Sequence, residues 1–180
     1  MNLEEEKRKQ IRETDRFFYL LVEDVLAATE AWRDNPSDFT RRCYIRTVMA
    51  FIEGNTFRFK KVSLWLHENI LPIFSPEEIV CLKEESVSIK ENGKIEIKNM
   101  HIKMLSNLIF SLESYAKAIN VDFNLNTSGE GWLALKKAIE KRDKITHPKT
   151  IEDFQVTEAE IIYFEKAASF YRETTLPLIE

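Results

Sequence analysis

WLALKKAIEKRDKITHPKT, residues 132–150, is the stretch around which the rest of the sequence is organised. Its first half carries Trp132, Leu135 and Ile139 at helical spacing, which predicts a helix with one apolar stripe. Its second half is basic. Residues 136–149 hold six Lys or Arg against two acids, a local balance of +4 in a chain whose net charge is −4. The predicted helix therefore leads into a positively charged segment.

Arg142 and His147 stand five positions apart within this segment, and Pro148 follows at once. On a continuous helix five residues turn through about 500°, so the two side chains would point roughly 140° apart. Because Pro148 disfavours the helical conformation for His147, we expect the helix to end between the two residues and His147 to fold back toward Arg142. An arginine that grips phosphate oxygens, beside an imidazole that moves a proton near neutral pH, suits chemistry on a phosphodiester.

The hexapeptide from Arg142 to His147, RDKITH, resembles the R-x4-H motif of HEPN domains (higher eukaryotes and prokaryotes nucleotide-binding). In that family a polar residue follows the arginine, and here it is Asp143. The family is an α-helical bundle with the motif near the end of a late helix, so the resemblance is close in the motif and loose in the architecture. Outside residues 127–175 the similarity is one of helix pattern only. The alternative is a basic helix end that complements the helix dipole, with an incidental histidine.

The resemblance implies a metal-independent endoribonuclease that cuts single-stranded RNA at a composite site in a homodimer, with no cofactor. The 2′-hydroxyl of the RNA would attack the adjacent phosphate, so no protein nucleophile is needed. His147 would be the acid/base or proton donor, Arg142 would stabilise transition-state charge, and Asp143 would orient one of them. The residues expected to hold RNA phosphates are all lysines: Lys141, Lys144 and Lys149.

Such proteins are typically toxins, antiphage defence factors or RNA-processing enzymes, so an antitoxin or another operon partner is a further expectation. In one subfamily a tyrosine two residues after the motif histidine receives a nucleotide from the antitoxin. Lys149 stands at that position here, which argues against that mode of silencing. Two other interpretations stay open. One is a non-catalytic HEPN module that dimerises or binds RNA or nucleotide; the other is a helical adaptor, which leaves the basic cluster unexplained.

Bulk composition predicts one domain over residues 1–180. A hydrophobic content of 44% with four glycines is typical of a compact, helix-rich protein. A pI near 5.6 restricts any RNA contact to a local surface. Cys43 and Cys81 are too few for a disulfide framework, and the start of the sequence does not read as a signal peptide, so we expect a cytoplasmic protein. We expect no metal site and no membrane span, because the three histidines lack metal-ligand spacing and apolar runs stay below 18 residues.

The fold class predicted from the whole pattern is all-α, a HEPN-like bundle of four to five helices with one inserted β-hairpin at about residues 86–98. Apolar periodicity places helices at about 3–33, 38–68 and 100–119, followed by the motif helix and a final helix that ends at Pro177, and a capping box with proline after it places a short helix at about 76–85. Capping boxes are expected at Ser75, Thr127 and Thr157, and Asn35 is expected to cap the second helix.

The hairpin is predicted from a change to period two. Pairing Ile89 with Ile95 and Val87 with Ile97 puts all four on one face, and this register needs a three-residue loop with Gly93 in the left-handed conformation. We expect this hairpin at the surface.

A second basic run, residues 41–61, holds six Lys or Arg and one acid, Glu53. We expect its charges to form a solvated face. Glu53 would be either a helix-edge carboxylate or a brace for an arginine inside the bundle.

Overall fold

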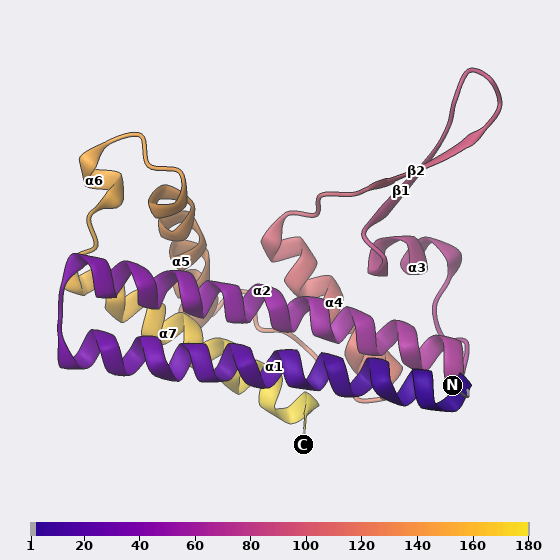
Figure 1. Ribbon diagram of the computed structural model, residues 1–180, viewed down its shortest axis with the longest axis horizontal. Helices are drawn as coiled ribbons and strands as arrows, with labels where there is room; N and C mark the ends of the chain where they lie inside the picture. Colours follow the sequence, from indigo (N-terminus) through magenta and orange to yellow (C-terminus); the bar gives the residue numbers. More distant parts are fainter. Residues whose placement is uncertain (1–2, 180) are drawn as a thin grey trace. The chain divides into compact units, whose positions relative to one another are not determined.

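The computed structural model describes residues 3–179, and these are mostly helical (Figure 1). The elements, in chain order, are α1 (Leu3–Asp34), α2 (Asp38–Asn69), α3 (Pro76–Leu82), β1 (Glu85–Ile89), β2 (Ile95–Asn99), α4 (Met104–Ala118), α5 (Glu130–Thr146), α6 (Ile151–Phe154), α7 (Glu158–Thr175) and the 3-10 turn η1 (Leu176–Leu178). The helical class and the hairpin are as predicted. None of the helices described in residues 3–179 is long and apolar enough to cross a membrane.

The chain forms two compact units. The first unit combines Met1–Asn55 with Leu125–Glu180, and the second unit is Thr56–Asn124. Helix α2 runs without a break from the first unit into the second. The prediction of one domain over residues 1–180 stays a prediction, and each unit is described by itself below.

The first unit is built on the packing of α5 against α7. Trp132, at the start of α5, meets Phe170 of α7 edge to face with ring centroids 6.3 Å apart. Side chains that are almost fully buried line the interior of this unit: Ile45, Val48, Ile52, Leu135, Ala138, Ile145, Ile161, Phe164 and Ala167. Removing this apolar area from water is the main stabilising contribution.

Helix α1 lies antiparallel to the first half of α2 (Figure 1). Trp32 stacks on Tyr44 at 5.6 Å, and Phe18 meets Phe51 at 5.8 Å. An apolar stripe along α1, made of Phe18, Leu21, Val25, Ala28 and Trp32, is only half-buried. The stripe therefore covers α2 without being enclosed itself.

The second unit holds the end of α2 with α3, the hairpin and α4. Its core contains Phe59, Leu64, Phe74, Leu82, Leu108 and Leu112. His67 serves the fold here, because its Nδ1 accepts hydrogen bonds from the backbone N–H groups of Ile73 (2.8 Å) and Phe74 (3.0 Å).

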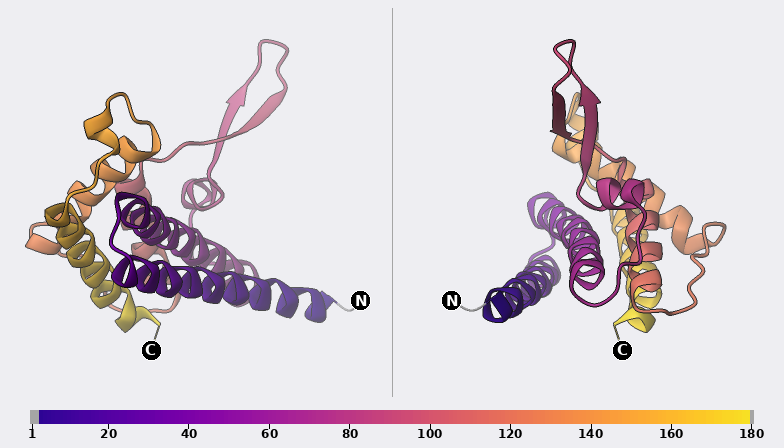
Figure 2. Two further views of the ribbon diagram at one scale, coloured as in Figure 1. Left: turned by 60° about the vertical axis from the view of Figure 1, so that its left-hand side comes forward. Right: turned by 90° about the vertical axis from the view of Figure 1, so that its right-hand side faces the viewer.

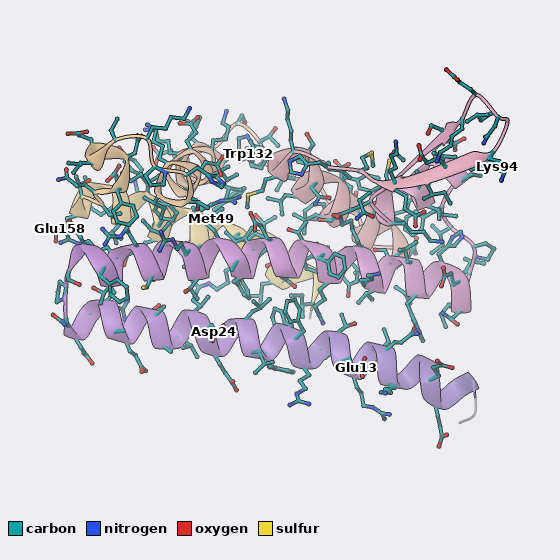
Figure 3. All side chains as sticks on the ribbon, turned by 45° about the horizontal axis from the view of Figure 1, so that its top comes forward. Glu13, Asp24, Met49, Lys94, Trp132 and Glu158 are labelled. Carbon is teal, nitrogen blue, oxygen red and sulfur yellow. The ribbon has the colours of Figure 1, made fainter. Side chains whose placement is uncertain are left out.

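The hairpin forms in the predicted register, with Ile89 opposite Ile95 and Val87 opposite Ile97. Lys90 N–H donates to the Lys94 carbonyl at 2.9 Å, which leaves a three-residue loop in which Gly93 has φ +76°. Lys94 marks the end of this loop in Figure 3, and Figure 2 shows the two strands as a ribbon that follows α3. The prediction of a surface hairpin is confirmed, because all four apolar side chains are exposed.

Several predicted boundaries and caps are wrong. Ser37, not Asn35, caps α2, since the Thr40 N–H donates to the Ser37 hydroxyl. Gly129 is the N-cap of α5, so the box expected at Thr127 does not form. Helix α4 begins at Met104 rather than near residue 100, and α3 ends at Leu82 because Glu84 takes a positive φ of 55°. The boxes at Ser75 and Thr157 are confirmed.

Candidate functional site

Helix α5 ends between Arg142 and His147, as the sequence predicts, and the approach of His147 to Arg142 stays a prediction. The helix ends at Thr146, and His147 follows as the C-cap with φ −127° and ψ 59°. Its backbone N–H still donates to the Asp143 carbonyl at 2.9 Å, which ties the residue to the last helical turn. The His147 side chain is exposed. The imidazole is therefore open to solvent.

Arg142 is held in place by two carboxylates. Its Nη2 pairs with Glu53 Oε1 of α2, and its Nε lies 3.3 Å from Asp143 Oδ1. The arginine side chain is 23% exposed, and its Nε is buried. Glu53 combines the two alternatives, because its side chain is 46% exposed at the edge of α2 and its carboxylate pairs with the motif arginine.

Three arginines of α2 bind backbone carbonyls around the motif. Arg46 Nη2 donates to the Ile145 carbonyl at 2.9 Å, and so caps one of the carbonyls left open at the end of α5. Arg42 Nη1 donates to the Phe154 carbonyl at 3.2 Å, with its guanidinium 3.9 Å above the Phe154 ring. Arg41 Nη1 donates to the Val156 carbonyl at 3.2 Å.

The expectation of a solvated basic face over residues 41–61 is wrong for Arg41 and Arg42, which are half-buried, while Arg46 is exposed. The guanidinium groups of all three arginines hold the end of α5 and the segment after it in place through backbone carbonyls. In the same run Lys60 is also taken out of solvent, since its side chain is 1% exposed and pairs with Glu84.

The segment after the motif contains a short helix that the sequence analysis missed. The Thr150 hydroxyl accepts a hydrogen bond from Asp153 N–H at 3.1 Å, and Asp153 Oδ2 accepts from the N–H groups of Thr150 (3.2 Å) and Lys149 (3.1 Å). This capping box opens α6. The signal was present as Thr-x-x-Asp, a variant of the pattern that identified the other boxes.

The three lysines expected to hold RNA lie in different settings. Lys144 and Lys149 are exposed beside His147 in the sequence. Lys141 instead points into the unit: its side chain is 11% exposed, its Nζ lies 3.0 Å from Glu160 Oε1, and it donates to the Gln155 carbonyl. Burial raises the pKa of Glu160, but hydrogen bonds from Thr157 and Lys141 outweigh burial and hold that pKa below its usual value. This arrangement gives Lys141 a role in fixing α5 to the start of α7.

The arrangement combines a fixed cation, an exposed imidazole and two exposed ammonium groups around one helix end. Such a surface can bind a phosphodiester and exchange a proton with it. Among residues 3–179, no cluster of three or more His, Cys, Asp or Glu side chains has the geometry to hold a metal ion. The chain matches no protein-family model, no curated protein and no solved structure.

Proposed function

We propose that the protein is a metal-independent endoribonuclease of the HEPN type, with a HEPN-like fold, which acts on single-stranded RNA. The observation that supports this most directly is the end of α5, where a braced Arg142 and an exposed His147 lie on either side of the last helical turn. The helix ends at Thr146, between Arg142 and His147, and the proposed cleavage needs this helix end because on a continuous helix the two side chains would point apart.

In the proposed reaction, the 2′-hydroxyl of the RNA attacks the adjacent phosphorus and the 5′-oxygen leaves. His147 donates the proton that the leaving oxygen needs, or removes one from the attacking hydroxyl. Arg142 stabilises the negative charge that builds on the phosphorane-like transition state. Asp143 and Glu53 hold the guanidinium fork at a fixed orientation, and this lowers the cost of ordering it during the reaction.

Lys144 and Lys149 bind flanking phosphates in this proposal, while Lys141 supports the helix. A second copy of the chain supplies a second Arg142 and His147, so that two pairs surround one phosphate. A toxin or antiphage defence factor, controlled by an operon partner, is the biological role that this chemistry serves best.

The test is cleavage of single-stranded RNA by pure protein in chelator. We expect the wild type to cut and to leave 2′,3′-cyclic phosphate ends, and an RNA with a 2′-deoxy substitution at the cut site to resist. His147→Ala should lower activity on the order of 10²–10⁴-fold while RNA affinity stays nearly intact. Arg142→Lys should also be poor, because an ammonium cannot replace a bidentate fork.

The matched control is His101→Ala, which removes an exposed histidine from the second unit and should leave cleavage unchanged. Equal cleavage by wild type and His147→Ala would contradict the proposal.

A second candidate is a non-catalytic module that binds RNA or nucleotide. The observation in its favour is that Arg142 already contacts two carboxylates, which compete with a phosphate for the guanidinium. Binding of RNA without cleavage of any RNA offered, in wild type and variant alike, would establish this candidate in place of the first.

A further inference from the structure

A cavity of about 530 Å³ lies within the first unit, between α1, α2 and α7, and contains none of the motif residues. Its walls are mostly apolar, with Phe18 of α1 and Val48, Phe51 and Ile52 of α2 among them. A cavity of several hundred Å³ with apolar walls and a few polar groups is typical of small-molecule sites.

Asn55 is the polar group buried most deeply in the lining, with 1% of its surface exposed. Its Nδ2 donates to the Tyr171 hydroxyl at 2.9 Å, which sets the orientation of the amide. The other end of the amide, Oδ1, is buried and has no hydrogen-bond partner among the described residues. Because a buried acceptor without a donor is unfavourable, this oxygen is suited to a donor brought by a ligand.

The exposed edge of the cavity is charged. Arg33, Glu165 and Arg172 all line it and are exposed, which gives two cations and one anion at the opening. Deeper in the lining, burial raises the pKa of Tyr44 to about 12, an effect that Glu165 adds to and Arg33 opposes. The interior therefore favours neutral groups, while the opening favours a negative charge.

We propose that this cavity binds a small organic anion with an apolar body, which donates one hydrogen bond to Asn55 Oδ1 and places its negative charge beside Arg33 and Arg172. This site is separate from the proposed ribonuclease function and does not depend on it.

The probe is 2-anilinonaphthalene-6-sulfonate, a fluorescent dye with an apolar two-part body, one N–H donor and a sulfonate at its far end. Its N-methyl analogue is the matched ligand, since it has the same body and charge but no donor. We expect the native protein to enhance the fluorescence of the dye with saturable, one-to-one binding. The N–H form should bind about tenfold more tightly than the N-methyl form, the value of one buried hydrogen bond.

Two variants test the assignment. Asn55→Leu keeps the volume and removes the acceptor, so both dyes should bind with similar affinity. Ala168→Phe fills the cavity from α7 and should abolish binding of both dyes. The control for the added ring is Ala27→Phe, at an exposed position of α1, which should bind as the wild type does. If Asn55→Leu fails to fold, the dye preference of the wild type and the loss in Ala168→Phe still decide the matter.

Three results would overturn the proposal: no dye binding by the folded wild type, equal affinity of the wild type for both dyes, or undiminished binding by Ala168→Phe. Dye that is expelled as light scattering shows a dimer forming would also overturn it, because a second copy of the chain would then be the occupant.

Discussion

Arg142 owes its position to a residue far away in the sequence. Glu53 lies on α2, where it is two helical turns beyond Arg46, and Arg46 caps the end of α5 through the Ile145 carbonyl. Residues seven apart share one helix face. One face of α2 therefore contacts Arg142 through Glu53 and the end of α5 through Arg46. Glu53 acts on the proposed reaction through Arg142 and is a positioning residue.

Glu53→Ala tests that role. Without its carboxylate the guanidinium loses one of its two fixed partners, and misplacement of a catalytic group by about 1 Å costs on the order of 100-fold. We expect kcat for RNA cleavage to fall about 10- to 100-fold with a smaller change in KM, and Glu53→Gln to recover most of the loss. Steady-state kinetics measures this.

The control for the loss of one negative charge is Glu140→Ala, at an exposed position of α5. If Glu53→Ala changes cleavage no more than Glu140→Ala does, Glu53 has no positioning role.

For single residues, the sequence predicts features that depend on neighbouring residues in the chain. The end of the helix before His147 follows from Pro148, because the restriction that a proline places on its predecessor operates within one peptide unit. The partner of Glu53 could not be predicted, since 89 residues separate it from Arg142 and no short pattern records the contact. The partner of Lys141 could not be predicted either. Its positive charge led to the prediction that it binds RNA, whereas its Nζ pairs with Glu160 of the same unit.

At the scale of elements, α5 and α7 approach closely at Gly131. A Cβ at this position would lie 2.5 Å from Phe170 Cδ2 and 2.7 Å from Phe170 Cβ, so the ring and its stem would have to move. We expect Gly131→Ala to destabilise the protein by about 1–2 kcal/mol, because overpacking outweighs the gain in helix propensity. Urea unfolding measures the change.

Phe170→Ala removes Cγ and Cδ2, two of the three atoms nearest the new methyl group, so the double variant should lose less than the sum of the two single changes. A Gly131→Ala protein more stable than the wild type would show that the helices have room to separate.

At the base of the hairpin the buried Lys60 pairs with the partly exposed Glu84. Lys60 pairs with Glu84 and donates to Asn107 Oδ1 at 2.7 Å, while Asn107 Nδ2 donates to Glu84 Oε1 at 3.2 Å. Burial raises the pKa of Glu84, but the hydrogen bond and charge of Lys60 and the bond from Asn107 outweigh it and lower that pKa. The folded protein therefore holds this carboxylate ionised at a pH where the unfolded chain begins to bind a proton.

The sign of the pH dependence follows. With a folded pKa below the unfolded value of about 4.3, the Glu84 contribution to stability is present above that pH and is lost as the pH falls through the folded pKa. We expect Glu84→Gln to lower the free energy of unfolding by about 2 kcal/mol at pH 7. This loss is smaller than for a fully buried pair, because Glu84 is partly exposed. The difference in free energy of unfolding between the wild type and Glu84→Gln, measured by urea unfolding, should become smaller from pH 5 to pH 3.

Lys60→Met combined with Glu84→Gln removes both charges and should recover much of the loss at pH 7. A gap between wild type and Glu84→Gln that is constant from pH 7 to pH 3 would show that the pair does not control this dependence.

Among the elements, the hairpin was the most fully predicted, because strand register and turn geometry constrain each other over a few residues. Helix ends were less accurate. Helix α4 starts four residues after the predicted position, and α2 begins at a cap formed by Ser37 and Thr40 rather than at Asn35. Several residues near each of these ends can form caps, and tertiary contacts choose among them.

At the scale of the molecule, the division into two units was not visible in the sequence. Helix α2 carries its apolar periodicity through Asn55 and Thr56, where the first unit gives way to the second. Gly54, Asn55 and Thr56 stand at this boundary, but α2 continues through them, so the sequence predicts one helix here rather than a linker. The all-α class was predictable because it depends on periodicity summed over the whole chain.

Dimerisation is the prediction that belongs to this scale. Each chain offers one Arg142 and one His147, whereas cleavage as proposed uses two such pairs around one phosphate. A two-fold axis near the end of α5 would bring each motif to its symmetry mate, since the same patch meets itself across such an axis. Ile151 is 75% exposed just after the motif and is apolar surface that such an interface would cover.

We therefore expect light scattering of the protein at tens of micromolar, without RNA, to give twice the chain mass of 21.2 kDa. Specific activity should fall on dilution, because the composite site is lost when the dimer dissociates. Ile151→Asp should shift the protein toward the monomer and lower cleavage in parallel, whereas Ile89→Asp, an equally exposed position on the hairpin, should do neither. A monomer that cleaves RNA with a specific activity independent of concentration would require one Arg142–His147 pair to be sufficient for the reaction, and the composite site would then have no role.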